Sequence, residues 1–396
     1  MTPLVVFSRR ILLPGGVYCG YLIAEGGKIT GLSKTRPGID AVYLDAEQYY
    51  VSPGFIDIHT HGGGGYDFMD GAAESISRGA AAHLHHGTTT LLPTTMASTE
   101  DELLAFLDNF QIAKASLAGG PYLHGVHLEG PYCSPEQAGA QDPRLITHPD
   151  RKQYERITEY SGGTIVRWSV APELPGAIEM GDFMFSRGIL PSIAHSDTEY
   201  AQVQEAFNHH YTLITHFYSG MSTIKRRSGL RVPGVIESGY IIEDIDVEVI
   251  ADGCHLPPEI LRMVYRIKGP DRVALVTDSM RAAGIDDPAG TYTLGSEKNG
   301  RPVIIEDGVA KLPDRSALAG SVATADRLVR VMHKEAGVPV SDAVRMMTAT
   351  PARIIGLQNI KGTIAVGMDC DLLFLDDDIN VKAVITGGVL RIDKQR

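Results

Sequence analysis

The sequence predicts a mixed α/β protein with a (β/α)8 barrel of the TIM type in the middle of the chain and a small β-sandwich domain formed by its two ends. The length of 396 residues exceeds one average domain and fits a barrel with an accessory domain. Between residues 53 and 355, short apolar runs alternate with helical patterns, which is typical of a parallel sheet with helical crossovers. Residues 1–52 and 356–396 lack long helical periodicity and are rich in strand and turn residues.

The two ends of the chain share one pattern of short strands separated by Gly-rich turns. In the N-terminal segment, strands are expected at residues 4–7, 17–24, 28–32 and 41–44. In the C-terminal segment, they are expected at residues 371–376, 381–386 and 389–392. Because two strand-rich ends flank a different middle, we expect them to pair with each other in one domain.

The middle of the chain offers eight strands, the number that a (β/α)8 barrel requires. They are expected at residues 55–59, 89–93, 123–128, 165–170, 190–194, 212–216, 247–251 and 273–277. Helical patterns separate most of them, for example at residues 100–116, 199–209 and 258–267. Residues 290–316 interrupt the alternation and predict a hairpin excursion, after which helices resume at 321–335 and 341–349.

Charge and cysteine usage exclude several classes of protein. The net charge of −12, from 36 basic and 48 acidic residues, argues against nucleic acid or an anionic membrane as the main partner. The four cysteines are widely spaced and form no C-x-x-C motif, as expected of cytosolic thiols. The N-terminus has too short an apolar run for a signal peptide, and no segment approaches the ~18 apolar residues of a membrane span. We therefore expect a cytoplasmic protein.

The first barrel strand ends in a histidine pair, His59 and His61, followed by four glycines. Residues two apart in a strand point to the same side, so both imidazoles project together. Such a pair suits a Zn- or Fe-type ion. With 14 His in 396 residues, chance alone gives about 0.5 His-x-His per chain, so the pair by itself is a weak signal.

The pair gains weight because other metal-binding residue types also fall at the ends of expected strands. Barrel enzymes place their catalytic groups at the C-terminal ends of the strands. A single histidine there is usually structural, but six such residues in register favour a metal centre; they are His59, His61, Glu129, His195, His216 and Asp278.

The chemistry of these side chains predicts their roles. The two carboxylate oxygens of Glu129 could bridge two ions, one held by His59 and His61 and the other by His195 and His216. Asp278 is expected to face the activated water as a general base and then to protonate a leaving nitrogen as a general acid. The sequence therefore predicts hydrolysis of an amide or a related C–N bond.

Seven motifs resemble the amidohydrolase superfamily and, within it, the N-acetylglucosamine-6-phosphate deacetylases. They are PGFIDIHTHG (53–62), HLEGP (127–131), Ala194-His195-Ser196, Thr215-His216, ADGCH (251–255), LVTD (275–278) and LAGS (318–321). HLEGP and ADG-x-H are more specific than His-x-His. The resemblance spans the whole chain and implies removal of acetate from N-acetyl-D-glucosamine 6-phosphate in amino-sugar catabolism, by a homodimer. It implies one or two divalent ions per chain, Zn or Fe in the first place, with Mn and Co also acceptable.

The resemblance also implies substrate contacts. Ala140 matches a position beside the sugar, and His255 matches a residue that contacts the sugar and polarises the acetyl carbonyl. The loop that lines the sugar corresponds to Leu318, Ala319 and Gly320. Arg227 matches a phosphate-binding arginine, within the densest basic run of an acidic chain.

One departure from the family pattern leaves the exact substrate open. Where the family usually shows Asn-Ala, this chain has Ser219-Gly220, so a shorter hydroxyl replaces an amide expected to contact phosphate. A related substrate such as N-acetylgalactosamine 6-phosphate therefore stays open. The sequence is also compatible with an amidohydrolase acting on a cyclic amide or an N-acyl amino acid, and with an inactive barrel that only binds a sugar phosphate.

Overall fold

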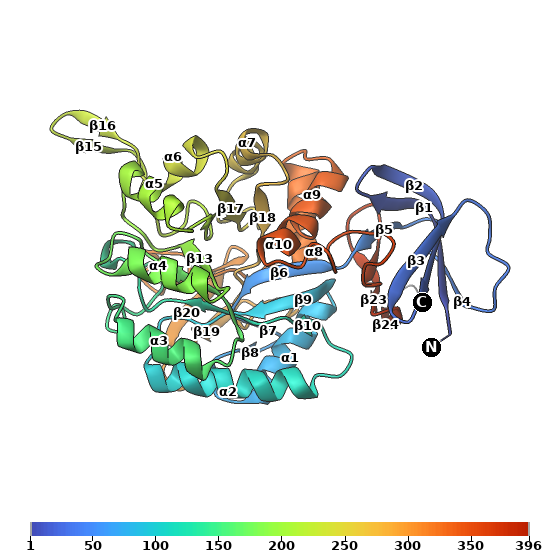
Figure 1. Ribbon diagram of the computed structural model, residues 1–396, viewed down its shortest axis with the longest axis horizontal. Coiled ribbons are helices and arrows are strands. Elements are labelled where there is room, and N and C mark those ends of the chain that lie inside the picture. Colours follow the sequence, from blue (N-terminus) through green and yellow to red (C-terminus); the bar gives the residue numbers. More distant parts are fainter. Residues whose placement is uncertain (1, 395–396) are drawn as a thin grey trace.

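The structure is a computed structural model that describes residues 2–394. A large α/β body carries most of the chain, and a β-sheet built from both ends of the chain lies against one side of it (Figure 1). Among residues 2–394, no helix is both long and apolar enough to cross a membrane.

The centre of the body is made of parallel strands in two sheets. One sheet has the order β10-β9-β6 and the other the order β11-β12-β13-β14-β17-β18. Their bounds are β6 (Phe55–Thr60), β9 (Thr88–Pro93), β10 (Tyr122–Leu123), β11 (Val126–Glu129), β12 (Ile165–Val170), β13 (Leu190–Ile193), β14 (Leu213–Ile214), β17 (Asp246–Val249) and β18 (Val273–Leu275). Each of the eight expected strands has a counterpart, and the third is divided into β10 and β11.

Two contacts join the sheets to each other. A parallel bridge between Thr94 and His127 connects the end of β9 to β11. At the opposite edges, the backbone N–H of Asp278, just after β18, donates to the carbonyl of His59 in β6 at 2.9 Å. The C-terminal ends of the first and last strands therefore lie side by side.

Helices follow the strands on the outside of the body (Figure 1). The eight that alternate with the strands are α1 (Ala73–Leu84), α2 (Glu100–Ser116), α3 (Arg151–Tyr160), α4 (Ala177–Ser186), α5 (Tyr200–Asn208), α6 (Val235–Ile241), α7 (Pro258–Lys268) and α8 (Ala325–Arg330). The expected helix at 321–335 begins only at Ala325 and changes to a π-helical turn at Val331–Glu335. It is followed by α9 (Val340–Met346) and α10 (Ala349–Ile354).

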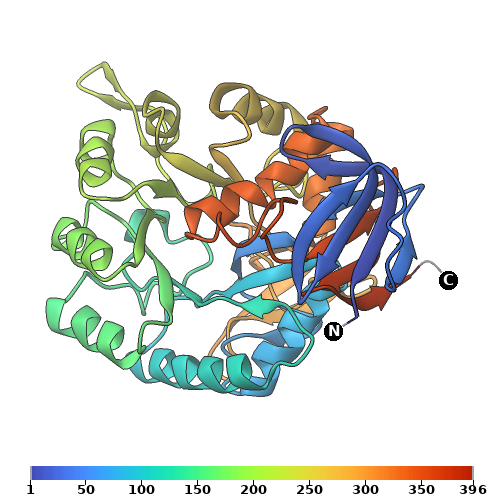
Figure 2. The same cartoon turned by 45° about the vertical axis from the view of Figure 1, so that its right-hand side comes forward.

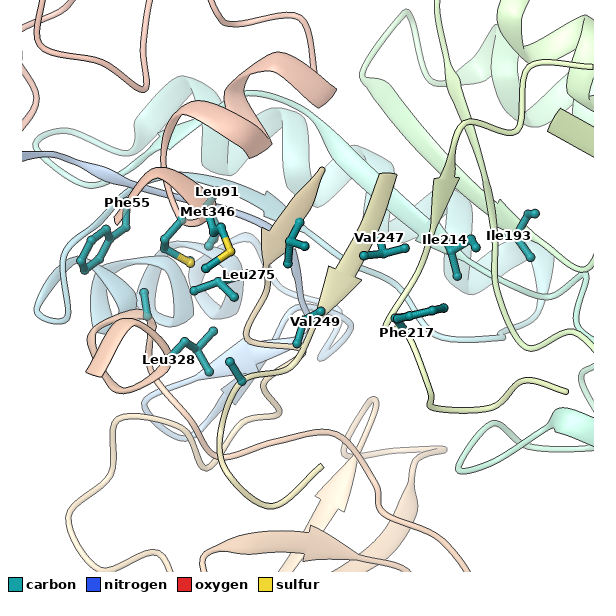
Figure 3. Close-up of a cluster of buried hydrophobic side chains, with 14 of the residues drawn as sticks. Phe55, Leu91, Ile193, Ile214, Phe217, Val247, Val249, Leu275, Leu328 and Met346 are labelled. Carbon is teal, nitrogen blue, oxygen red and sulfur yellow. The ribbon is translucent and has the colours of Figure 1, made fainter. Parts of the chain in front are cut away.

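Helix α2 shows why the sequence predicted its bounds. The Thr99 hydroxyl accepts the N–H of Glu102, whose carboxylate accepts the N–H of Thr99 in return, so a capping box starts the helix. Its buried residues Leu103, Phe106, Leu107 and Phe110 follow the i, i+3, i+4, i+7 spacing of one helix face. In the same core, side chains from β13, β14, β17 and β18 pack with Leu328 of α8 and Met346 of α9 (Figure 3).

Both ends of the chain contribute strands to one eight-stranded sheet, in which the blue N-terminal and red C-terminal strands lie side by side (Figure 2). The strands are β1 (Leu4–Leu13), β2 (Gly16–Glu25), β3 (Lys28–Ser33), β4 (Val42–Asp45), β5 (Tyr50–Pro53), β22 (Leu372–Leu375), β23 (Val381–Thr386) and β24 (Val389–Asp393). Antiparallel pairing of β22 with β5, with Phe374 opposite Val51, joins the two ends.

The sequence prediction missed two features of this sheet. Strand β1 is longer than expected, because the charged pair Arg9-Arg10 interrupts its apolar run at a bulge between Ser8 and Ile11. Strand β5 was not expected at all, and it leads through Gly54 directly into β6. A Cβ atom on Gly54 would lie 2.1 Å from the Thr89 hydroxyl, so only glycine fits at this close approach.

Two excursions leave the alternating pattern. The expected hairpin excursion is a three-stranded antiparallel sheet of β19 (Gly290–Leu294), β20 (Arg301–Glu306) and β21 (Val309–Lys311). A second hairpin, β15 (Lys225–Arg227) with β16 (Leu230–Val232), projects beyond α5 and α6 at the upper left of Figure 1. Short pieces at Gly62–Gly63 (β7) and Tyr66–Asp67 (β8) pair just after β6.

Candidate active site

The C-terminal ends of the parallel strands bring together all six expected metal-binding residues. His59 is part of β6 and His61 follows it, while Glu129 is the last residue of β11. His195, His216 and Asp278 come two or three residues after β13, β14 and β18. All six are buried, and five of them line a cavity of about 280 Å³ that opens at this end; the exception is His59, which lies beneath it.

Glu129 lies at the centre of the six residues. The Nε2 atoms of His59 and His195 are each 3.5 Å from its Oε1, and that of His216 is 3.0 Å away. The Nε2 atom of His61 is 3.5 Å from its Oε2. Two groups of three therefore have ligand atoms within 4.8 Å of one another, His59–His61–Glu129 and Glu129–His195–His216. This is the arrangement needed for one carboxylate to bridge two ions.

The donor set fits a divalent cation. The Nε2 atom of His59 is buried and has no hydrogen-bond partner among residues 2–394, although it faces two carboxylates at 3.4 and 3.5 Å. A buried polar atom without a partner is costly, and a cation between imidazole and carboxylate groups supplies that partner.

Three of the six residues hold unusual backbone conformations. The φ angles are +45° at His195, +29° at His216 and +45° at Asp278. Non-glycine residues rarely adopt positive φ, and such strain costs on the order of 1–3 kcal/mol each. The fold maintains this strain at the ends of three strands of one sheet, β13, β14 and β18, which is typical of residues held in place for function.

The charges in the site stabilise one another. Burial alone would lower the pKa of His61, but its hydrogen bond to Asp278 and the charges of Glu129 and Asp278 raise that pKa to about 9. Burial would raise the pKa of Asp278, but the neighbouring His59 and His61 lower it to about 2. A cation that binds here therefore has to displace a proton from His61, and it meets an ionised Asp278.

Six of the eight expected substrate-binding residues line the cavity: Ala140, Ser219, Gly220, His255, Leu318 and Gly320. The ring of His255 is fixed, because its Nδ1 atom contacts the Asp252 carboxylate at 2.8 Å. That carboxylate also accepts the backbone N–H groups of Cys254 and His255. Burial would raise the pKa of Asp252, but its contacts with His255 lower it.

The glycine at position 220, where the family usually has alanine, has a physical reason in this structure. Gly220 has a φ of +57°, and a Cβ atom there would lie 2.9 Å from Nδ1 of His195. That same nitrogen contacts the carbonyl of Gln137 at 2.8 Å. In this chain, glycine at 220 therefore leaves room for the imidazole of His195 and its hydrogen bond.

The other two expected substrate-binding residues do not line the cavity. Ala319 is fully buried in a separate apolar cluster under the β19–β21 excursion, while its neighbours Leu318 and Gly320 face the cavity. Arg227 lies on the β15–β16 hairpin with 73% of its side chain exposed, and its guanidinium pairs with Glu199 at 2.8 Å. The structure thus separates the basic run from the cavity of its own chain.

Two residues at the site were not foreseen. Gln141 donates from Nε2 to Oε2 of Glu129 at 2.9 Å and accepts the N–H of Ala97 at 2.8 Å, so it fixes the central carboxylate. Tyr218 lines the cavity with a φ of +80°. The only sign in the sequence that these two residues lie at the site was their place next to expected site residues, since Gln141 follows Ala140 and Tyr218 precedes Ser219.

Comparisons with known proteins give a consistent result. The sequence pattern of the Amidohydrolase family matches residues 50–391. N-acetylglucosamine-6-phosphate deacetylase of Lysinibacillus sphaericus is 31% identical over 372 residues, covering 93% of this chain and 92% of that protein. N-acetylgalactosamine-6-phosphate deacetylase of Escherichia coli O157:H7 is 30% identical over 388 residues, covering 98% of both. A solved structure of an N-acetyl-D-glucosamine-6-phosphate deacetylase variant from Mycobacterium smegmatis, in complex with N-acetyl-D-glucosamine-6-phosphate, is similar with a TM-score of 0.90 and 29% identity, covering 99% of this chain and 100% of that one.

Proposed function

The chain belongs to the amidohydrolase family, and from this premise we propose that it is a metal-dependent deacetylase. It hydrolyses N-acetyl-D-glucosamine 6-phosphate to D-glucosamine 6-phosphate and acetate in amino-sugar catabolism. The observation that carries the proposal is the convergence of four imidazole Nε2 atoms and Asp278 around Glu129, at the floor of a cavity that His255 also lines. The relatives that act on amino-sugar phosphates, at about 30% identity over nearly the whole chain, support the substrate class.

One or two divalent ions complete the site, with Zn or Fe as the first candidates and Mn or Co as the next. His59, His61 and Glu129 would hold one, and Glu129, His195 and His216 the other. A divalent ion in such a site supplies a water whose pKa falls to about 7.

The chain's own residues supply the proton transfers. Asp278 has a pKa of about 2, so its carboxylate is ionised at neutral pH and accepts the proton of the attacking water. It then hands that proton to the leaving nitrogen of the sugar. His255, whose Nδ1 contacts Asp252, would turn its other ring nitrogen to the acetyl group and polarise the carbonyl on which negative charge develops. Ala140, Ser219, Leu318 and Gly320 enclose the sugar.

We also propose that the parallel strands form one closed (β/α)8 barrel, spanning residues 53–355. The contacts that support closure are the Thr94–His127 bridge and the hydrogen bond from Asp278 to His59. Eight helices alternating with the strands support it as well.

Residues 1–52 and 356–396 would form the β-sandwich domain. Strand β1 pairs with β4 through its first half and with β5 through its second, so the sheet divides at the bulge and can fold over itself. A separate apolar cluster, which includes Leu4, Val6, Leu372 and Phe374, lies within it.

A homodimer explains the position of Arg227. The hairpin that carries Arg227 projects from the barrel and exposes Leu230 by 72% and Ile224 by 51%, as expected of a segment that meets another chain. We propose that Arg227 of one chain binds the substrate phosphate in the cavity of the other. The four unpaired cysteines support a cytoplasmic location.

The test is acetate release from N-acetylglucosamine 6-phosphate, N-acetylgalactosamine 6-phosphate and unphosphorylated N-acetylglucosamine, with metal analysis of the same sample. We expect the highest kcat/KM for N-acetylglucosamine 6-phosphate. Absence of any preference for phosphorylated sugars would contradict the substrate class.

A second candidate is deacetylation of N-acetylgalactosamine 6-phosphate. Ser219-Gly220 favours it, because the shorter side chains change the wall beside His195, and one relative of nearly equal similarity carries that name. A higher kcat/KM for the galactosamine epimer in the same panel would establish it. Cyclic amides and N-acyl amino acids serve as the control for a broader amidohydrolase.

A further inference from the structure

A layer of buried polar side chains lies beneath the candidate metal site, and its centre is an ion pair. Arg167 of β12 and Glu248 of β17 are both completely buried, and two guanidinium nitrogens contact the two carboxylate oxygens. Barrel interiors are usually filled by branched apolar side chains. A buried ion pair seldom stabilises a fold more than apolar residues of the same volume would, so this pair calls for another explanation.

Glu248 contacts a candidate metal ligand directly. Its Oε2 atom lies 3.3 Å from Nδ1 of His59. The other nitrogen of that ring, Nε2, faces the metal site at 3.5 Å from Glu129 and 3.4 Å from Asp278. The ring of His59 therefore connects Glu248 on one side to the metal site on the other.

The four histidines of the site are not held in the same way. Within residues 2–394, Nδ1 of His61 and Nδ1 of His216 have no hydrogen-bond partner. Nδ1 of His195 contacts a backbone carbonyl, that of Gln137. Only the ring of His59 has a carboxylate behind it among the described residues. A carboxylate in this position fixes the tautomer with the proton on Nδ1, orients the ring and raises the basicity of Nε2.

Arg167 in turn holds Glu248 in place. A guanidinium has five N–H donors, and the structure provides an acceptor for each of them. The acceptors are both oxygens of Glu248, the hydroxyls of Ser192 and Thr215, and the carbonyl of Ile58. Because these acceptors come from strands around the barrel, Arg167 fixes the carboxylate against all of them.

We propose that Glu248, fixed by Arg167, is the positioning residue that makes His59 a strong metal ligand, and that it governs the affinity of the ion bound by His59 and His61. Glu248 also accepts the backbone N–H of His216 at 3.3 Å, but the Nδ1 atom of that histidine has no carboxylate behind it among the described residues. The inference rests on the proposed metal dependence of the enzyme.

The test measures metal bound per chain after dialysis of the full-length protein against a series of zinc buffers. For Glu248→Gln we expect the affinity of the first ion to fall 10–100-fold, roughly the cost of losing such a partner, with a smaller change for the second. Glu74→Gln, which removes a surface carboxylate paired with Arg78, is the matched control and should bind like the wild type.

A double-mutant cycle shows whether the effect passes through His59. In a His59→Ala background, Glu248→Gln should change the affinity of the remaining ion less than about twofold. A loss as large as in the wild-type background would overturn the proposal, because Glu248 would then act on the whole site.

A second variant keeps the test decisive if Glu248→Gln does not fold. Arg167→Met with Glu248→Leu removes both charges and fills the same space, an exchange that barrels and other cores often tolerate. Folding is checked by circular dichroism, and the first ion should still be lost preferentially. Wild-type affinity in either folded variant overturns the proposal. A wild-type protein that binds no ion contradicts the proposed metal dependence instead, so the two failures are distinguishable.

Discussion

We assign the six candidate metal ligands and the β15–β16 hairpin to the same proposed substrate, but the ligands are buried and the hairpin is exposed. The six residues of the cluster are at most 8% exposed and sit on strand ends that hydrogen-bond to one another. The hairpin is held to the body by the ion pairs Lys225–Asp197 and Arg227–Glu199, both partly open to solvent. Such surface pairs contribute only about 0–1 kcal/mol each. The six residues of the candidate metal site therefore come from one chain, whereas Arg227, which we propose binds the phosphate, would need a partner chain to reach a cavity.

The largest effect is expected from removing two of the buried candidate metal ligands. The double change His195→Ala with His216→Ala leaves Glu129 without its partners for the second ion. We expect one ion fewer per chain and a fall in activity of roughly 10⁴-fold or more. Metal analysis and acetate release on the same sample check this. Full activity with unchanged metal content would refute the assignment of the cluster.

Removing His59 and His61 tests the other group of candidate ligands in the same way. Changing both His59 and His61 to Ala should lower metal content by about one ion per chain if the cluster holds two. Unchanged stoichiometry would mean a single ion, held by Glu129, His195 and His216.

Asp278→Asn keeps the size and shape of the side chain at this position but removes the carboxylate that we propose as the general base. General acid–base groups contribute typically about 10²–10⁴-fold, so kcat should fall by at least that much for phosphorylated and unphosphorylated sugars alike. Steady-state kinetics with both substrates provide the measurement. A kcat within tenfold of the wild type would move the proton transfer to another residue.

Arg227→Ala tests whether the exposed arginine of the hairpin binds the substrate phosphate. Losing a charge-assisted hydrogen bond of about 1.5–3 kcal/mol should lower kcat/KM for the phosphorylated sugar about 10- to 150-fold. Turnover of unphosphorylated N-acetylglucosamine should stay nearly unchanged. Equal damage to both substrates would mean that Arg227 is structural or that the phosphate binds elsewhere.

Co-expression of two impaired variants, assayed with the phosphorylated sugar, shows which chain Arg227 serves. In a dimer of one Arg227→Ala chain and one Asp278→Asn chain, action across the interface leaves one cavity with both residues intact. We expect about half of the wild-type activity per mixed dimer, since one of two sites works. Activity no higher than that of Arg227→Ala alone would place Arg227 in its own chain's cavity.

The candidate metal site and Arg227 should also differ in their dependence on pH. A protonated imidazole cannot bind a metal ion, and the pKa of His61 in the metal-free site is about 9. Affinity for the first ion should therefore rise about tenfold per pH unit from pH 7 to 9 and then level off. The carboxylate of Asp278, with a pKa of about 2, adds no slope there. Zinc titrations across this range measure the slope, and a flat profile would contradict the charge state of His61. Phosphate recognition by Arg227 should not follow this profile, because a guanidinium stays charged throughout.

Features with a local signal in the sequence could be predicted, and features that depend on distant parts of the chain could not. The parallel strands bring their C-terminal ends together, so six residues spread between positions 59 and 278 could be assigned to one site from their places after expected strands. Helix α2 could be bounded because its capping box and its apolar spacing are local signals. Strand β5 could not be predicted, because it is four residues long, ends in Pro53 and pairs with β22, which lies more than 300 residues later in the sequence.

Side-chain direction and buried charge were harder to foresee. Ala319 was grouped with Leu318 and Gly320, but Ala319 packs in the apolar cluster while its two neighbours line the cavity, and its motif gave no sign of this. Glu248 lies between Val247 and Val249, which pack into the core shown in Figure 3. The alternation of side chains along a strand turns Glu248 inward, and only the structure shows that it meets Arg167 there.

The junction from β5 through Gly54 into β6 has a consequence for how the protein is made. Strand β6, which carries His59 and leads into His61, emerges early during translation, yet Leu372 of β22 pairs with Pro53, just upstream of it. The N–H of Gly54 likewise donates to the carbonyl of Asp371 at 2.9 Å. The nascent chain therefore cannot complete the junction that precedes its first ligand strand until β22 has left the ribosome. We expect the finished protein, rather than the growing chain, to acquire its metal.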